Sequence, residues 1–153
     1  MKKNLILLLI FSTTIMSFAQ QSSIKSFKGY FNFSYNEESG SITMEVKELN
    51  REFLYVSSLS SGIGSNDIGL DRGQLGGERI VKFIKTGNKL LLVQPNQDYR
   101  ALTDNKLERN SIEQAFAKSV LFGFPIQQEK EGSYFIDVTP FLLQDMHGVS
   151  NRL

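Results

Sequence analysis

The sequence predicts an α+β fold made mostly of antiparallel β-hairpins with one or two short helices. Three observations support this prediction. Apolar and polar side chains alternate over several short runs, turn-forming residues separate these runs, and helical spacing occurs only late in the chain. Strand-like runs follow one another without intervening helices, which argues against the βαβ order of a parallel sheet.

The first 19 residues are expected to be a secretory signal peptide. Two lysines follow Met1, an apolar run extends from Leu5 to Phe11, and the small residues Ser17 and Ala19 suit cleavage after position 19. The apolar run falls short of the roughly 18 to 20 residues that span a bilayer. A lipid anchor would need a cysteine, which the chain lacks. We therefore expect an exported protein, periplasmic or extracellular, that is free of the membrane after cleavage.

Residues 20–153 are expected to form a single β-rich domain. The chain carries 17 basic and 16 acidic residues, and the loss of two lysines with the leader leaves 15 against 16. This near-zero charge predicts no nucleic-acid-binding face and no polybasic membrane patch. Without cysteine, packing must hold the domain together, and 12 phenylalanines and 5 tyrosines supply large apolar side chains for that purpose.

A β-hairpin is expected at the start of the domain. Aromatic residues alternate with polar ones over residues 27–35, which places the aromatics on one face of a strand. Residues 36–40 suit a turn, and the alternation resumes over residues 42–46. These two runs are predicted to pair.

Further strands are expected on both sides of a long glycine-rich stretch. Residues 53–59 form a more apolar run that suits a central strand. Beyond the glycine-rich stretch, residues 79–85 and 89–94 flank Thr86-Gly87-Asn88, which is typical of a tight hairpin turn. A second hairpin is predicted there.

The main helix is predicted in the last third of the chain. Apolar residues recur at helical spacing from Ile112 to Val120. Ser111, followed three residues later by Gln114, suits the N-terminal cap. The pattern predicts a helix from about residue 107 or 112 to residue 122.

One more strand and a second helix complete the prediction. Residues 133–138 form the strand, and Thr139 followed by Pro140 is typical of a helix start, which opens a helix over residues 141–146. Because the chain stops soon after this helix begins, we expect the domain to be truncated at its C-terminal end.

The glycine-rich stretch is the expected contact surface. Six of the 12 glycines fall within residues 62–77. Glycine costs conformational entropy on folding, and long loops without their own structure usually bind or cover something. The expected interface or binding-loop residues are the polar ones of this stretch: Asn66, Asp67, Asp71, Arg72, Gln74 and Glu78.

Templates for ion and nucleotide sites fit this stretch poorly. Asp67, Asp71 and Glu78 stand at positions one, five and twelve of a calcium loop, but Arg72 occupies the position that needs glycine. We favour a role in which the two aspartates cap turns and Arg72 pairs with one of them. Gly62-Ile63-Gly64 lacks the third glycine of a dinucleotide fingerprint, since Asp67 stands there.

Catalytic motifs are absent from the sequence. His147 is the only histidine, so no histidine-based metal triad can form within this chain, and Gly-x-Ser-x-Gly does not occur. The place of His147 beside Gly148 at a helix end suits a partner of the helix dipole or an interface residue. The sequence predicts no catalytic residue and no metal ligand.

Three separated blocks resemble one protein family. They are SNDIGLDRGQLGGER at 65–79, LVQPN at 92–96 and FLLQDMHGV at 141–149. Together they resemble the N-terminal domain, of unassigned function, of secreted bacterial zinc-dependent metallopeptidases of metzincin type. This resemblance implies a later catalytic domain in which a His-Glu-x-x-His-x-x-Gly-x-x-His motif binds zinc and its glutamate activates water. That motif does not occur in residues 1–153, so zinc is expected only in the catalytic domain.

Two functions follow as expectations. In the favoured one, residues 20–153 are the N-terminal accessory domain of an exported zinc peptidase, inactive alone, which docks through residues 60–79 on the peptidase domain of the same polypeptide. In the other, the chain is a stand-alone periplasmic module whose glycine-rich loop binds a peptide, a glycan or Ca²⁺. A third option, a hydrolase built on Asp67, Asp71 and Glu78, lacks a shell that would position these carboxylates.

Overall fold

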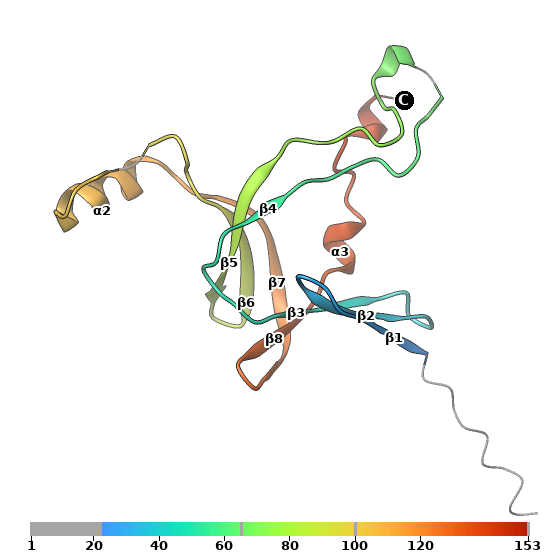
Figure 1. Cartoon of the computed structure of the whole chain (residues 1–153), viewed down its shortest axis with the longest axis horizontal. Coiled ribbons are helices and arrows are strands. Elements are labelled where there is room, and N and C mark those ends of the chain that lie inside the picture. The colour runs from blue at the N-terminus through green and yellow to red at the C-terminus, as the bar shows by residue number, and fades with distance from the viewer. Residues whose placement is uncertain (1–22, 65, 100, 153) are drawn as a thin grey trace, which may run out of the picture.

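The computed structural model describes residues 23–64, 66–99 and 101–152. Its strands form an eight-stranded sheet in the order β1-β2-β3-β8-β7-β6-β5-β4, which curves into a half-barrel (Figure 1). The prediction of a mostly antiparallel sheet with few short helices is confirmed, although the helices are a smaller part of the fold than the α+β label suggests. The expected signal peptide lies outside the described residues. No helix in the described ranges is long and apolar enough to cross a membrane.

Every neighbouring pair in this sheet is antiparallel. The strands are β1 (Ile24–Phe27), β2 (Asn32–Asn36), β3 (Ile42–Val46), β4 (Phe53–Tyr55), β5 (Arg79–Thr86), β6 (Lys89–Gln94), β7 (Ser119–Lys130) and β8 (Ser133–Asp137). The helices are short: η1 (Asn66–Ile68), α2 (Lys106–Ala115), α3 (Thr139–Leu142) and η2 (Val149–Asn151).

The first predicted strand is in fact two strands. The expectation of one strand over residues 27–35 is wrong, because the chain turns between β1 and β2 and the two strands pair with each other. Gly29 lies in that turn, and the aromatic pair that follows leaves the sheet. The rings of Tyr30 and Phe31 pack against Phe53, with centroids 6.1 and 5.1 Å apart. The expected pairing of the next two runs is confirmed by β2 and β3.

The predicted central strand over residues 53–59 is also wrong. β4 is only three residues long, stands at the end of the sheet and pairs with β5 alone among the described strands. Its ladder runs from Phe53 opposite Val81 to Tyr55 opposite Arg79. Beyond Tyr55 the chain continues into residues 57–76, which we call the glycine-rich arm. The apolar character of β4 thus belongs to an edge strand.

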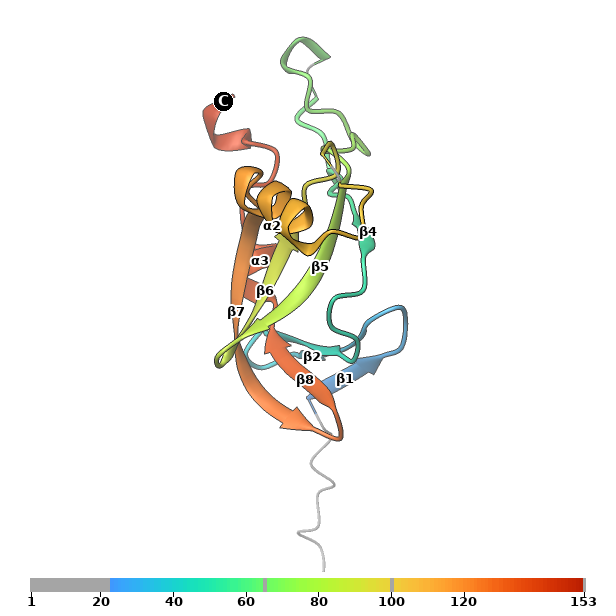
Figure 2. The same cartoon turned by 90° about the vertical axis from the view of Figure 1, so that its left-hand side faces the viewer.

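Helix α2 ends earlier than its spacing predicts. It stops at Ala115, seven residues before the predicted end, and its cap is Asn105, whose side chain accepts a hydrogen bond from the amide of Leu107 at 2.9 Å. Residues 119–122 belong to β7, where pairing with β6 overrides the helical pattern. No residue of α2 is buried, and the helix stands away from the sheet in Figure 1 and lies in front of the strands in the turned view of Figure 2.

The later elements follow the prediction closely. β5 and β6 form the expected hairpin, β8 matches the expected strand, and α3 begins at Thr139 with proline in its first turn. However, α3 has only four residues, so the second predicted helix is shorter than expected. The chain after α3 turns towards the glycine-rich arm (Figure 1).

Strand β7 produces the curvature of the sheet. It has 12 residues, pairs with β6 through its first half and with β8 through its second half, and shifts register in both ladders. Such irregularities bend a strand and increase its twist. The core lies on the resulting concave side and consists of Val46, Val81, Phe83, Leu90, Leu92, Phe124, Ile136, Val138 and Phe141.

Candidate functional site

The concave side of the sheet is not filled. It contains an open cavity of about 770 Å³, which we call the apolar cavity. Its walls come from β2, β3, β4 and α3 and its floor from β5, β6 and β7. The lining residues are Tyr30, Phe31, Phe33, Ile42, Met44, Phe53, Leu54, Tyr55, Phe83, Leu92, Phe124, Val138, Phe141 and Leu142.

Aromatic contacts close the two ends of this cavity. At one end the ring of Phe31 lies 5.1 Å from that of Phe53, and at the other the ring of Tyr55 lies 5.7 Å from that of Phe141. β4 runs between these two contacts. Beside it the cavity stays open to solvent, and Leu142, which lines the cavity from α3, is 56% exposed. The structure therefore presents apolar side chains to water along one edge of the sheet, a feature that marks binding surfaces in soluble proteins.

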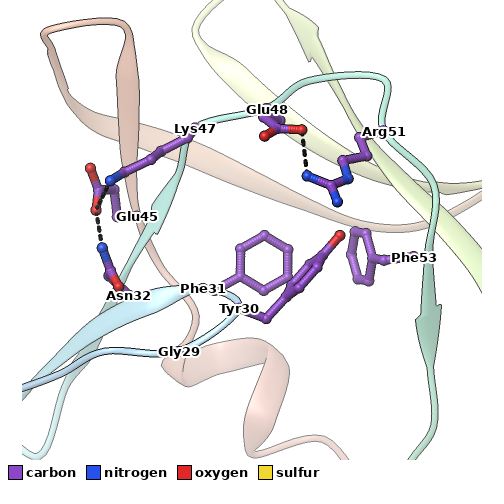
Figure 3. A pocket seen from close by; sticks show the side chains of 9 residues that line it. All are labelled: Gly29, Tyr30, Phe31, Asn32, Glu45, Lys47, Glu48, Arg51 and Phe53. Carbon is purple, nitrogen blue, oxygen red and sulfur yellow. Dashed lines mark hydrogen bonds and ion pairs between the residues drawn. The ribbon is translucent and has the colours of Figure 1, made fainter.

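A smaller, charged pocket of about 320 Å³ adjoins the apolar cavity and is shown in Figure 3. The two spaces share Tyr30, Phe31 and Phe53. We call this space the rim pocket. Its polar side chains are Asn32, Glu45, Lys47, Glu48 and Arg51.

Two groups of charged side chains stand in the rim pocket (Figure 3). Arg51 forms an ion pair with Glu48 at 2.8 Å, and its guanidinium carbon lies 5.6 Å from the centre of the Tyr30 ring. Glu45 accepts a hydrogen bond from Asn32 at 2.8 Å, and its carboxylate lies 3.6 Å from Lys47 Nζ. The side chains of Lys47 and Arg51 are more than half exposed, which leaves both cations accessible.

Glu45 is held in its ionised form. Hydrogen bonds from Asn32 and Ser133, with the nearby charge of Lys47, lower its pKa, and they outweigh the opposing effect of burial. Its side chain is also the least exposed of the ion-paired carboxylates described here. Glu45 thus organises the pocket wall, whereas the exposed cations can meet a ligand.

The glycine-rich arm folds back on itself. The amide of Leu59 donates to the carbonyl of Gln74 at 3.0 Å, and the amide of Gly76 donates to the carbonyl of Ser57 at 2.8 Å. Leu70, near the tip, is only 1% exposed. The arm is therefore an irregular hairpin whose two sides are joined by backbone hydrogen bonds, and not an open loop.

Close approach of neighbouring atoms, backbone in one case and a side chain in the other, explains two of the glycines in the arm. A Cβ atom at Gly62 would lie 2.7 Å from the amide nitrogen of Arg72, and one at Gly76 would lie 2.3 Å from Oγ of Ser57. Both distances are shorter than a Cβ atom tolerates. At these positions glycine allows the two sides of the arm to meet.

The predicted interface residues belong to this arm and its root. Asn66 begins η1, and the side chains of the others are exposed: Asp67, Asp71, Arg72, Gln74 and Glu78.

Few contacts join these residues. The amide of Asp71 donates to Oε1 of Gln74 at 3.1 Å, and the amide of Gln74 donates to the carbonyl of Asp71 at 3.0 Å, which forms a turn. The ion pair expected between Arg72 and Asp67 or Asp71 is not formed; these exposed side chains remain solvated. Within the described part of the chain, no group of three or more His, Cys, Asp or Glu side chains could hold a metal ion.

The segment after α3 lies beside the arm. Arg152 Nη1 donates to the carbonyl of Gly69 at 3.4 Å. His147 lies at a cleft between this segment and the arm, and its buried Nε2 atom has no hydrogen-bond partner among the described residues. The position of His147 therefore agrees with packing between the two segments. The first and third blocks of the family resemblance meet here, since a Cβ atom at Gly76 would lie 3.5 Å from Cε1 of His147.

Sequence reasoning missed the apolar cavity and the rim pocket. The aromatic alternation near the N-terminus was visible, but it read as one face of one strand. Which aromatics remain uncovered depends on which strands end the sheet, and the identification of β4 as an edge strand requires the strand order. For Arg51, a basic residue next to an apolar run was the only local signal.

The fold and the site define a β-rich domain, a curved antiparallel sheet with an open apolar cavity. The model of one family, described as a domain of unknown function, DUF5117, matches residues 73–153, and the chain belongs to this family. The matched residues extend from the second side of the arm through η2 and include the floor of the apolar cavity. Comparisons with curated proteins and with solved structures gave no significant match.

Proposed function

We propose that this chain is a non-catalytic domain of an exported zinc-dependent metallopeptidase and that it docks on the catalytic part of that enzyme. The three blocks that resemble the N-terminal domains of such enzymes support the enzyme class. The observation that carries the docking role is the apolar cavity, which stays open along β4.

Docking would remove this surface from water. Each Å² of apolar surface that is buried stabilises by roughly 25 cal/mol, so a partner that covers the cavity gains binding energy from it. Two side chains that line the opening, Tyr30 and Leu142, are well exposed in the chain alone. These aromatic and aliphatic groups are the kind that anchors interface cores.

The glycine-rich arm offers a second contact in this proposal. Backbone hydrogen bonds across the arm fix the positions of its exposed polar residues, Asp71 and Arg72 among them. Polar rims around an apolar centre are the usual anatomy of an interface. Zinc and the water-activating glutamate would belong to the catalytic part, and this chain would act by supporting it.

The test begins with the DNA that follows the codon for Leu153. A frame that encodes a His-Glu-x-x-His segment supplies the catalytic part, which is then produced separately and mixed with the purified exported chain. We expect co-elution in size-exclusion chromatography and a higher zinc-dependent peptidase activity in the mixture. Independent elution together with unchanged activity would contradict the proposal.

A stand-alone binding module is the second candidate, and the size of the cavity favours it. A volume of about 770 Å³ lies within the range of roughly 300 to 1,000 Å³ that is common for small-molecule sites. In that case the purified chain would be a stable monomer whose melting temperature rises with a small ligand. A thermal-shift screen of peptides, glycans and Ca²⁺ separates the two candidates.

A further inference from the structure

The two ends of the sheet differ in how they are protected. β1 carries Lys25, which pairs with Glu37, and charged side chains on an edge strand discourage further pairing. β4 consists of Phe53, Leu54 and Tyr55 and carries no charge. Among the described residues, no strand pairs with its outer edge. The edge formed by β1 is therefore protected against further strand pairing by charge, and the edge formed by β4 is not.

The edge formed by β4 and the apolar cavity lie side by side. All three residues of β4 line the cavity, so a strand added to β4 would place side chains over its mouth. Side chains alternate between the two faces of a strand, and every second one would point into the cavity. Strand addition of this kind takes affinity from backbone hydrogen bonds and specificity from pockets for alternate side chains.

The antiparallel pattern of the sheet predicts the direction of that segment, and the rim pocket predicts the charge at its C-terminal end. Every pair in this sheet is antiparallel, and an added strand that keeps this pattern would run from Tyr55 towards Phe53. Its C-terminal end would then reach the rim pocket, where Arg51 and Lys47 present accessible cations. Arg51 has donors beyond the one that contacts Glu48, and a second carboxylate can share them.

We propose that β4 binds an internal extended segment of a partner protein, antiparallel, with apolar side chains at alternate positions followed by an acidic side chain that contacts Arg51. This proposal rests on the docking function above and names the kind of segment that docks. The apolar side chains fill the cavity between the Phe31–Phe53 and Tyr55–Phe141 contacts. The acidic side chain enters the rim pocket.

The experiment uses the purified exported chain and fluorescent peptides with both ends blocked. The probe is Val-Thr-Val-Ser-Val-Thr-Glu, in which the glutamate shares a strand face with the valines; it is compared with the same peptide ending in lysine and with one whose central valine is proline. Fluorescence anisotropy should show saturable binding of the first peptide, about fivefold tighter than the lysine peptide, the upper range for an exposed ion pair. The proline peptide should not bind, because it cannot complete the ladder.

Variants of the chain locate the site. Arg51→Gln should remove the preference for the glutamate peptide over the lysine peptide or reverse it, because Glu48 loses its ion-pair partner. Leu142→Asp should abolish binding, because it places a charge at the cavity mouth, whereas Leu143→Asp should not; Leu143 is the more exposed neighbour and does not line the cavity. Circular dichroism checks that each variant is folded, and a second cavity variant, Tyr30→Asp, replaces any that is not.

Several results would overturn this inference. They are the absence of saturable peptide binding up to about 1 mM, equal binding of the proline peptide, and equal effects at Leu142 and Leu143. Saturable binding of a fluorescent fatty acid in the cavity, with no peptide binding, would assign the site to lipid instead. If the chain associates with the peptidase part but Arg51→Gln and Leu142→Asp leave association unchanged, the docking function stands and this inference fails. Peptide binding without peptidase association gives the opposite outcome.

Discussion

The glycine-rich arm and the apolar cavity differ in how far the chain itself pairs their backbone groups and covers their apolar side chains. The arm, which is prominent in the sequence, closes through its own backbone hydrogen bonds and buries Leu70. The cavity, which no local motif marks, leaves apolar side chains and one strand edge open. Glycine density therefore shows here how a segment folds onto itself, whereas the uncovered apolar surface is where we propose that a partner docks.

The largest expected effect tests whether the cavity floor is part of the core. Phe124 is 1% exposed and contacts the rings of Phe83, Phe122 and Phe141. Phe124→Ala should lower the free energy of unfolding by about 3–5 kcal/mol, because it removes a buried ring and leaves a void. Urea denaturation measures this loss. A loss below about 1 kcal/mol would mean that the floor is not packed as described.

The next effect tests whether the arm is a structured unit. Leu70→Ala should cost about 2 kcal/mol, the low end for a buried leucine, because the arm is small. Native-state hydrogen exchange should show faster exchange at the amides of Leu59 and Gly76, which cross-link the arm. Unchanged exchange at these amides would show that Leu70 does not hold the arm closed.

Two glycines, one inside the arm and one directly after it, provide a matched pair. Gly62→Ala should destabilise by about 1–3 kcal/mol, because its Cβ would overlap the backbone of Arg72. At Gly77 a Cβ meets nothing within 4 Å, and the same substitution should be nearly neutral. Thermal melts of the two variants measure the difference. Equal melting temperatures would contradict the close approach of the two sides of the arm.

Acid should destabilise the segment after α3, which lies beside the arm, because protonation of Asp145 weakens the hydrogen bonds that this carboxylate accepts. Hydrogen bonds from the amides of Ser150 and Val149 and from the Ser150 hydroxyl lower the pKa of this carboxyl. Because the folded-state pKa lies below the unfolded one, the stabilisation is present above the unfolded value of about 3.9 and disappears as the pH falls through the folded pKa. Asp145→Asn should reduce stability at pH 7 and flatten the loss of stability in acid, measured by melts from pH 7 to pH 2.5.

The smallest effect on stability is expected at the mouth of the cavity. Leu142 is 56% exposed, so Leu142→Ser should change the free energy of unfolding by no more than about 0.5 kcal/mol. The same substitution should weaken association with the catalytic part, since a docking surface contributes to binding more than to folding. A large loss of stability, or unchanged association, would remove Leu142 from the docking surface.

The alternation of apolar and polar side chains predicted the sheet and several of its strands. Which strands lie at the edges of the sheet, and where the helices end, depended on the tertiary fold. β5, β6 and β8 were predictable because their apolar patterns and turns are local. The end of α2 was not, because residues that suit a helix pair with β6 instead. The cavity could not be predicted, since Phe31, Phe53 and Phe141 come from three distant segments that meet only in the folded sheet.

The most direct test of docking at the cavity is amide hydrogen exchange of the chain, alone and in complex with the catalytic part. No strand of the described residues pairs with the outer edge of β4, so exchange at Phe53–Tyr55 should slow in the complex, while the hydrogen-bonded amides inside the glycine-rich arm change little. Protection confined to the arm, with β4 unchanged, would contradict docking at the cavity and would place the interface on the arm that the sequence first indicated.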